Sequence, residues 1–109
     1  MKKLFVLVPY MGRTDEEIQA IREDTLLLYK NATHEDAELS IPHGKRLTGD
    51  LEAMFDADVV VGVKYHVADP VCSIVAQAAY VYGRTVIEDR DVAQYRLPEN
   101  EQSEGGEAE

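Results

Sequence analysis

An unbroken run of apolar, mostly β-branched residues, Val59-Val60-Val61-Gly62-Val63, constrains the fold most strongly. Side chains alternate between the two faces of a strand, so a run without a polar residue indicates a strand that is covered on both faces. Such strands are typical of the centre of a parallel sheet, where helices cover both sides. The run therefore predicts an α/β fold.

Strand and helix patterns alternate on both sides of this run. The expected order is a strand at Leu4–Val8, a helix starting at Thr14, a strand at Ala37–Ile41, a helix starting at Thr48 or Gly49, the strand Val59–Val63, a helix from Asp69 to Tyr82, and a strand at Thr85–Ile87. This alternation requires right-handed crossovers and predicts a mostly parallel sheet. With 109 residues, the chain can bury one core, which we assign to residues 1–97.

Local signals predict where the helices begin and which face they bury. Thr14-x-x-Glu17 is a capping box, and Asp69-Pro70 combines an N-cap with a proline at the first helical position. Gly83 is expected to end the last helix. The expected apolar positions are Ile18, Ile21, Thr25 and Leu28, with Leu27 beside them and a pattern that fades by Asn31, and then Leu51, Met54 and Phe55. Lys45 and Arg46 are expected in a loop.

The net charge argues against nucleic acid as a partner. The chain carries −10, but five glutamates lie in a Gly/Ser/Glu-rich segment, which leaves −5 for residues 1–98. Binding to nucleic acid requires a basic face that neutralises phosphates, and a moderately acidic body lacks one. We expect residues 98–109 to form an acidic disordered tail.

The single cysteine and the short apolar runs favour a cytoplasmic protein without a membrane segment. Cys72 has no partner for an internal disulfide, and the sequence has no Cys/His spacing typical of a metal site. The apolar run Leu4–Val8 ends at Pro9, so it is shorter than a secretory signal requires. No cofactor or metal is expected.

Candidate ligand-binding residues follow the expected strands, because the carboxyl ends of parallel strands and the following helix starts open onto one crevice. The candidates are Pro9, Tyr10, Met11, Gly12, Arg13, His43, Lys45, Arg46, Asp58, Lys64, Tyr65, Asp69 and Ser73. In this set a tyrosine can stack on a base, an aspartate can accept sugar hydroxyls, and Arg13, Lys45 or Arg46 can bind a phosphate. The combination predicts a nucleoside or nucleotide site.

Each candidate also has a structural alternative. Tyr10 can line the core, Arg13 can pair with Asp15 or Glu16, and Lys45 and Arg46 can form a solvated loop. Asp58 can cap a turn, and Asp69 has a sufficient role as a helix N-cap. His43 and His66 lack the carboxylate or cysteine partners that a metal site needs.

Three blocks of sequence resemble the nucleoside 2-deoxyribosyltransferase-like family, including its small, often phage-borne members. The blocks are Val8–Ile18, Ala57–Val60 and Val71–Glu88, and the resemblance covers residues 3–88. It implies a small flavodoxin-like or Rossmann-like sandwich with four or five strands, a nucleoside-type ligand, and a homodimer or a higher homo-oligomer. In that comparison Asp58 occupies a sugar-binding position, and Asp69 another substrate-contacting position.

The sequence departs from the family pattern at the nucleophile. Family transferases carry a glutamate early in the last helix, in a pattern like Cys-Arg-Ile-Glu, whereas this chain has Cys72-Ser73-Ile74-Val75. Displacement at an anomeric carbon passes through an oxocarbenium-like state that a carboxylate must stabilise, and valine cannot do so. Val75 would then only line a ligand pocket. Cys72 is expected to be a small buried residue.

Three functions are consistent with these features. The first is a catalytically degenerate protein that binds a nucleoside or nucleotide, for example to sequester an ADP-ribose-type signal in phage counter-defence. The second is an N-glycosidic bond enzyme, a transferase or hydrolase, that uses Asp69 or Asp58. The third is an oligomeric structural protein with a vacant crevice, in which Ala76, Ala79 and Tyr80 form the interface.

Overall fold

The computed structural model describes residues 1–92 and contains a four-stranded, all-parallel sheet in the order β2-β1-β3-β4. The elements are β1 (Lys2–Leu7), α1 (Asp15–Thr33), β2 (Ala37–Leu39), α2 (Arg46–Asp56), β3 (Val59–Gly62), the 3-10 turn η1 (His66–Ala68), α3 (Pro70–Val81), β4 (Val86–Glu88) and the 3-10 turn η2 (Asp89–Asp91). The predicted α/β class with a small flavodoxin-like or Rossmann-like sheet is confirmed. The expected tail lies outside the described residues.

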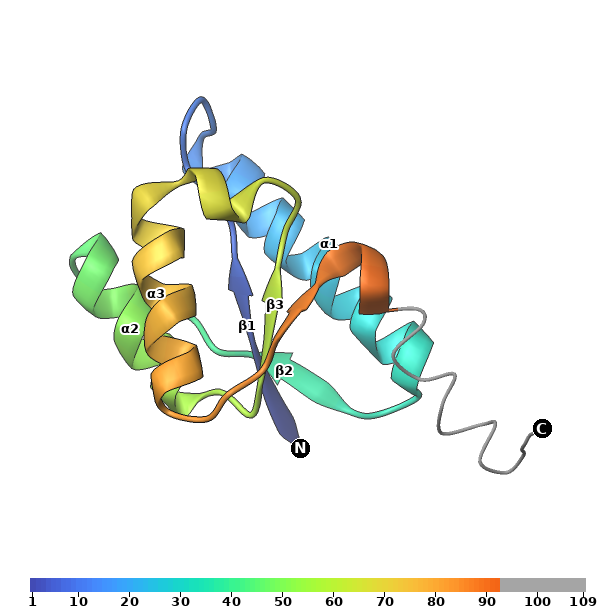
Figure 1. The fold of residues 1–109 in the computed structure, drawn as a ribbon. Helices are drawn as coiled ribbons and strands as arrows, with labels where there is room; N and C mark the ends of the chain where they lie inside the picture. The colour runs from blue at the N-terminus through green and yellow to red at the C-terminus, as the bar shows by residue number, and fades with distance from the viewer. Residues whose placement is uncertain (93–109) are drawn as a thin grey trace.

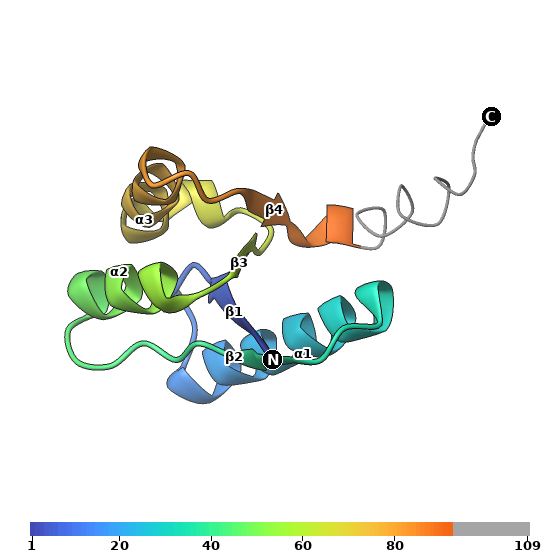
Figure 2. The same cartoon turned by 90° about the horizontal axis from the view of Figure 1, so that it is seen from below.

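The helices cover both faces of the sheet. Figures 1 and 2 show α2 and α3 together on one side of the strands, whereas α1 lies on the other side. The side chains of β1 follow this arrangement: Leu4 and Val6 pack in the core under α1, and Phe5 packs in the core under α2 and α3. In β3, Val61 belongs to the first core and Val60 to the second. The predicted burial of this strand on both faces is therefore confirmed.

Two predicted helix starts are formed as the sequence indicates. The Glu17 N–H donates to Thr14 Oγ1 at 3.1 Å, and the Thr14 N–H donates to Glu17 Oε1 at 2.8 Å. Asp69 is the N-cap of α3, with Pro70 as the first helical residue. Gly83, with φ of +76°, follows the helix end, where a left-handed backbone favours glycine.

The buried face of α1 differs from the predicted one. The helix continues to Thr33, and its buried residues are Ile18, Arg22, Thr25, Tyr29 and Ala32. Leu27 and Leu28 are exposed instead. The apolar pattern misled the prediction because the side of α1 that faces the sheet includes an arginine and a tyrosine, whose polar ends have partners of their own.

The start of α2 also differs. The helix begins at Arg46, and Lys45 is its N-cap without a side-chain hydrogen bond. Gly49 lies within the helix, where an added Cβ would collide with the His43 carbonyl oxygen. This glycine permits a close approach of backbone and does not start the helix. Phe55 is exposed and contacts the Tyr82 ring edge-on at 4.8 Å.

Candidate functional site

The carboxyl ends of β1 and β3 form the point where the chain leaves the sheet in opposite directions. The strands are neighbours, but β1 leads to α1 on one face and β3 leads to α3 on the other. Open α/β sheets bind ligands at such a switch point. We call the edge formed by the strand ends the carboxyl edge. It brings together Pro9–Arg13 and Lys64–Asp69, and the Tyr10 N–H donates to Asp69 Oδ2 at 3.0 Å.

Asp69 is almost fully occupied by protein donors. Its Oδ1 accepts hydrogen bonds from the N–H groups of Val71 at 3.0 Å and Cys72 at 3.2 Å and from Arg46 Nη2 at 3.0 Å. Burial alone would raise the pKa of Asp69, but the hydrogen bonds from Tyr10, Cys72 and Arg46 outweigh it and lower the pKa. The carboxylate is therefore an ionised structural anchor at the start of α3.

Tyr10 and Arg46 also bind each other. The Arg46 Cζ lies 3.6 Å from the centroid of the Tyr10 ring, which is a close cation–π contact. The Tyr10 hydroxyl accepts a hydrogen bond from Arg22 Nη2 at 3.2 Å. One face of the tyrosine is thus covered by a guanidinium and is closed to a stacking base.

A buried aspartate extends this arrangement, which we call the charge cluster and define as Tyr10, Arg22, Arg46, Asp50 and Asp69. Asp50 Oδ1 lies 4.0 Å from Arg22 Nη2, and its Oδ2 lies 3.9 Å from Arg46 Nε. Burial raises the pKa of Asp50, although the two arginines oppose the shift. Sequence reasoning missed Arg22 and Asp50. The i,i+4 spacing of Arg46 and Asp50 was the available signal.

The carboxyl edge also contains an open cavity of about 850 Å³ beyond the ends of β3 and β4. Its lining residues are Leu28, Val63, Lys64, Tyr65, His66, Val67, Glu88, Asp89 and Arg90. Of the predicted site residues, Lys64 and Tyr65 lie here. Glu88 to Arg90 were not among the predicted site residues, because no motif after Ile87 indicates how the chain continues beyond β4.

Tyr65 is held in an unusual backbone conformation at this cavity. Its φ is +66°, and it is 70% exposed. A tyrosine in the left-handed region is strained, and such residues persist where the surrounding structure fixes them. Lys64 Nζ lies 5.1 Å from the centroid of its ring. The loop therefore presents an aromatic ring and a cation together.

The loop is fixed from below by His66. Its ring lies directly over Gly62, where an added Cβ would be 2.5 Å from the His66 Cε1. Its Nδ1 lies 2.9 Å from the Val63 carbonyl oxygen. The Ala68 N–H donates to the Tyr65 carbonyl at 3.0 Å, which closes the turn. The position of Tyr65 thus depends on backbone hydrogen bonds and a buried ring.

The other predicted residues that follow β1 and β2 make local contacts or lie away from the cavity. Arg13 Nη1 donates to the Pro9 carbonyl at 2.9 Å instead of pairing with Asp15 or Glu16. Met11, Gly12 and Arg13 line a shallow hollow on the first turns of α1. Lys45 is an exposed helix cap, and His43 faces a separate groove beside α2.

The structure does not bring three other named residues to the cavity. Asp58 lies just before β3, where its Oδ2 accepts a hydrogen bond from the Lys3 N–H at 2.9 Å. It is therefore at the amino ends of the strands, opposite the carboxyl edge. Val75 is fully buried in the core under α3, and the half-buried Ser73 does not line the cavity. Cys72 is also buried, and burial raises the pKa of its thiol to about 12, so the sulfur stays protonated.

Within residues 1–92, no helix combines the length and the apolar character needed to cross a membrane. The same residues contain no group of three or more His, Cys, Asp or Glu side chains placed to hold a metal ion. Comparisons with protein-family models, curated proteins and solved structures found no match.

Proposed function

We propose that the protein binds a nucleoside or nucleotide in the open cavity at the carboxyl edge. The observation that carries this proposal is Tyr65, which is held outward in a strained conformation with Lys64 beside its ring. A base can stack on the exposed ring, and the ammonium can bind a phosphate. The cavity volume of about 850 Å³ lies in the range of small-molecule sites.

The last residue of β4 and the two residues after it supply the remaining polar groups. Arg90 Nε pairs with Glu88 Oε1 at 2.9 Å, and the arginine side chain is 77% exposed. An exposed ion pair contributes little stability, so Arg90 can turn to a phosphate at small cost. The Glu88 and Asp89 carboxylates can then accept hydrogen bonds from ribose hydroxyls.

We further propose that binding occurs without turnover. Asp69 carries four protein donors, and Asp58 lies at the opposite edge of the sheet, so neither is free to attack an anomeric carbon or to activate water. Position 75 is buried in the core, away from the cavity lining. These contacts support the binding function over the alternative of an N-glycosidic bond enzyme.

A ligand panel tests the proposal. Thermal unfolding is followed with adenosine, AMP, ADP and ADP-ribose, because a ligand at 100 times its Kd adds about 2.7 kcal/mol to the free energy of unfolding. We expect at least one of them to raise the Tm. Tyr65→Ala should remove the shift, Tyr65→Phe should keep it, and Tyr80→Ala, a control at another exposed tyrosine on α3, should leave it unchanged.

The same incubations distinguish binding from catalysis. Chromatography of the mixtures, with and without an added free base, should show no released or exchanged base. Release of base that Glu88→Gln abolishes would contradict the proposal and would place a catalytic carboxylate at the end of β4. The absence of any Tm shift across the panel would exclude the nucleotide site itself.

We also propose that the chain forms a homo-oligomer through the outer face of α3. No charged residue occurs in Pro70–Val81. Ala76 and Ala79, the alanines expected at such an interface, are buried in the core, whereas Ile74 and Val81 are 50% and 80% exposed on this helix. A soluble monomer rarely exposes a large apolar patch, and an uncharged face is self-complementary across a two-fold axis. Sedimentation analysis should show a dimer or larger species that Val81→Glu dissociates. Leu27→Glu, at an exposed leucine of α1, is the control.

A further inference from the structure

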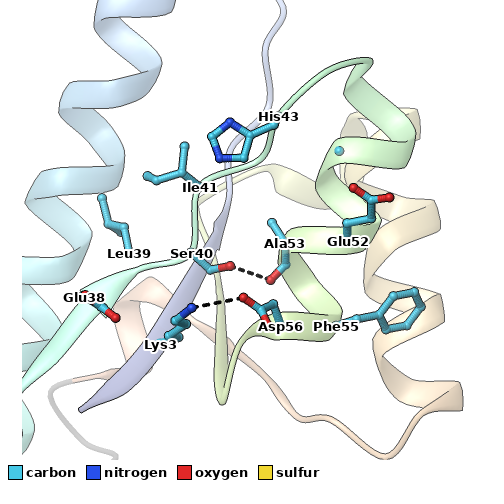
Figure 3. A pocket seen from close by; sticks show the side chains of 11 residues that line it. Lys3, Glu38, Leu39, Ser40, Ile41, His43, Glu52, Ala53, Phe55 and Asp56 are labelled. Atoms are coloured by element: carbon cyan, nitrogen blue, oxygen red, sulfur yellow. Dashed lines mark hydrogen bonds and ion pairs between the residues drawn. The ribbon is translucent and has the colours of Figure 1, made fainter.

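A second groove lies beside β2, the edge strand at the other side of the sheet from β4 and the proposed nucleotide cavity. We call it the β2 groove; it has a volume of about 660 Å³ and lies between the edge strand β2 and helix α2 (Figure 3). Its lining residues are Lys3, Glu38, Leu39, Ser40, Ile41, His43, Gly49, Glu52, Ala53, Phe55 and Asp56. Because β2 and β4 are the two edge strands, the groove is separate from the cavity after β4.

Part of the outer edge of β2 is open for pairing. Among the described strands, β2 pairs only with β1. The Lys2 N–H donates to the Asp36 carbonyl, and the Ser40 N–H donates to the Leu4 carbonyl. Backbone groups alternate in direction along a strand, so those of Ala37 and Leu39 point away from β1. Ala37 is only 5% exposed, whereas Leu39 is half-buried, so Leu39 offers the accessible N–H and C=O groups. An open edge of this kind is a template for an added strand.

The side chains around the groove define the chemistry of its ligand. Glu38 projects from β2, and Glu52 and Asp56 lie one turn apart on α2, so three carboxylates surround the groove (Figure 3). The Lys3 ammonium is already paired with Asp56 at 3.2 Å. Among the described residues, Lys3 is the one lysine or arginine in the lining and also interacts electrostatically with Glu38, so three carboxylates share a single ammonium.

Apolar surface lies between these charges. Ile41 is 39% exposed and Phe55 is 40% exposed, and Leu39 and Ala53 complete the lining. Lysine and arginine combine a cationic end with an aliphatic stem, so they match both features. The groove thus fits basic side chains better than acidic or purely apolar ones.

We propose that the β2 groove binds an extended, basic peptide segment of another protein, which adds to the sheet as a strand beside β2. Its backbone pairs with the outward N–H and C=O groups of Leu39, and its lysine or arginine side chains reach Glu38 and Glu52. The charge pattern selects this occupant. This interaction is independent of the nucleotide cavity.

Two other occupants are disfavoured by charge. Residues 99–109 of the chain contain five glutamates and no lysine or arginine, so they carry the same sign as the groove. A second copy that paired through β2 would bring Glu38 close to its own equivalent, and like charges across paired strands are destabilising. A basic partner avoids both repulsions.

The test uses a short fluorescent peptide that alternates lysine and valine, titrated with the full chain and followed by anisotropy. We expect saturable binding that Glu38→Lys and Glu52→Lys each weaken by about tenfold, which corresponds to about 1.4 kcal/mol. Glu23→Lys makes the same change of charge on an exposed part of α1 and should bind like the unchanged chain. Tyr65→Ala should also leave peptide binding unchanged.

Three results would overturn the proposal. The first is equal weakening by Glu23→Lys, which would show general charge attraction. The second is unchanged affinity for two peptides in which every other backbone nitrogen is methylated, one peptide for each alternation. Methylation removes the N–H groups along one edge of the peptide and so blocks strand pairing. The third is displacement of the peptide by spermidine with a Kd equal to that of the peptide, which would make the groove a site for small cations. If no nucleotide binds to the cavity, peptide binding to the β2 groove is still expected, so the two proposals fail independently.

Discussion

The charge cluster and the open cavity lie at the same edge of the sheet, but their side chains are used differently. In the cluster, Tyr10, Arg46 and Asp69 bind one another, and Asp50 is 2% exposed. At the cavity, Tyr65 is 70% exposed, and Lys64 Nζ lies 5.1 Å from the centroid of its ring. Similar residue types therefore stabilise the fold in one region and face solvent in the other.

The difference teaches that residue type and position at a strand end do not by themselves define a ligand site. A polar side chain is available to a ligand only if its hydrogen-bonding capacity is not already satisfied by the protein. Asp69 fails this criterion, since both of its oxygens accept bonds. The comparison predicts that substitutions in the cluster change stability, whereas substitutions at the cavity change binding.

The largest effect is expected for Asp69→Ala. This change removes the N-cap of α3 and leaves Arg46 without its closest carboxylate, so the free energy of unfolding should fall by about 3 kcal/mol. Urea unfolding measures it. Asp89→Ala, at the cavity, is the matched control and should change stability little. A drop below about 0.5 kcal/mol for Asp69→Ala would remove the structural assignment of the cluster.

A smaller effect is expected for Gly62→Ala, which tests how the cavity loop is held. The new Cβ would meet the His66 ring, so we expect a loss of about 2 kcal/mol and a weaker nucleotide-induced Tm shift. In the background of His66→Ala, the same glycine substitution should cost less, because the clash is gone. Equal costs in both backgrounds would show that the ring does not fix the loop.

The two aspartates of the cluster should respond to pH in opposite directions. The folded-state pKa of Asp69 is lowered, so the stability it contributes is present above its unfolded pKa of about 3.9 and is lost as the pH falls through the folded value. The folded-state pKa of Asp50 is raised, so its contribution is lost as the pH rises. The free energy of unfolding is measured for the unchanged chain and for both variants from neutral to acidic pH. As the pH falls, the stability difference between the unchanged chain and Asp69→Asn should shrink, whereas the difference between the unchanged chain and Asp50→Asn should grow. Parallel curves for both variants would contradict these assignments.

The smallest effect on stability is expected for Tyr65→Gly, which sharpens the comparison from the cavity side. Glycine adopts the positive φ without strain, but it loses more conformational entropy on folding, so the free energy of unfolding should change by less than about 1 kcal/mol. The nucleotide-induced Tm shift should nevertheless disappear. A large destabilisation would instead identify Tyr65 as a packing residue.

Short-range signals in the sequence predicted the fold well. The unbroken apolar run Val59–Val63 predicted a strand buried on both faces and therefore a parallel sheet. The capping box at Thr14 and the Asp69-Pro70 pair predicted two helix starts. These signals work because they depend on neighbours along the chain. Gly49 was misread for the opposite reason, since its role is a close approach to the His43 backbone that no local pattern reveals.

The candidate site was predicted less completely, because availability depends on long-range contacts. Lys64 and Tyr65 line the cavity, but Arg46 is held by Asp69, which lies 23 residues away in sequence. Arg22 was not considered because an arginine interrupts the apolar stripe of α1. Its burial is understandable only when the Tyr10 hydroxyl and Asp50 are placed beside it.

The contacts of Asp69 have a consequence for the lifetime of the folded chain. The carboxylate bonds to segments that are 59 and 23 residues away in sequence, and the bond to Tyr10 can form only after the ends of β1 and β3 have come together. Interactions that form after the rate-limiting barrier slow the escape from the native state and hardly affect how fast it is reached. If the Tyr10 bond forms late, Asp69→Asn should speed unfolding more than it slows folding, which stopped-flow measurements would show.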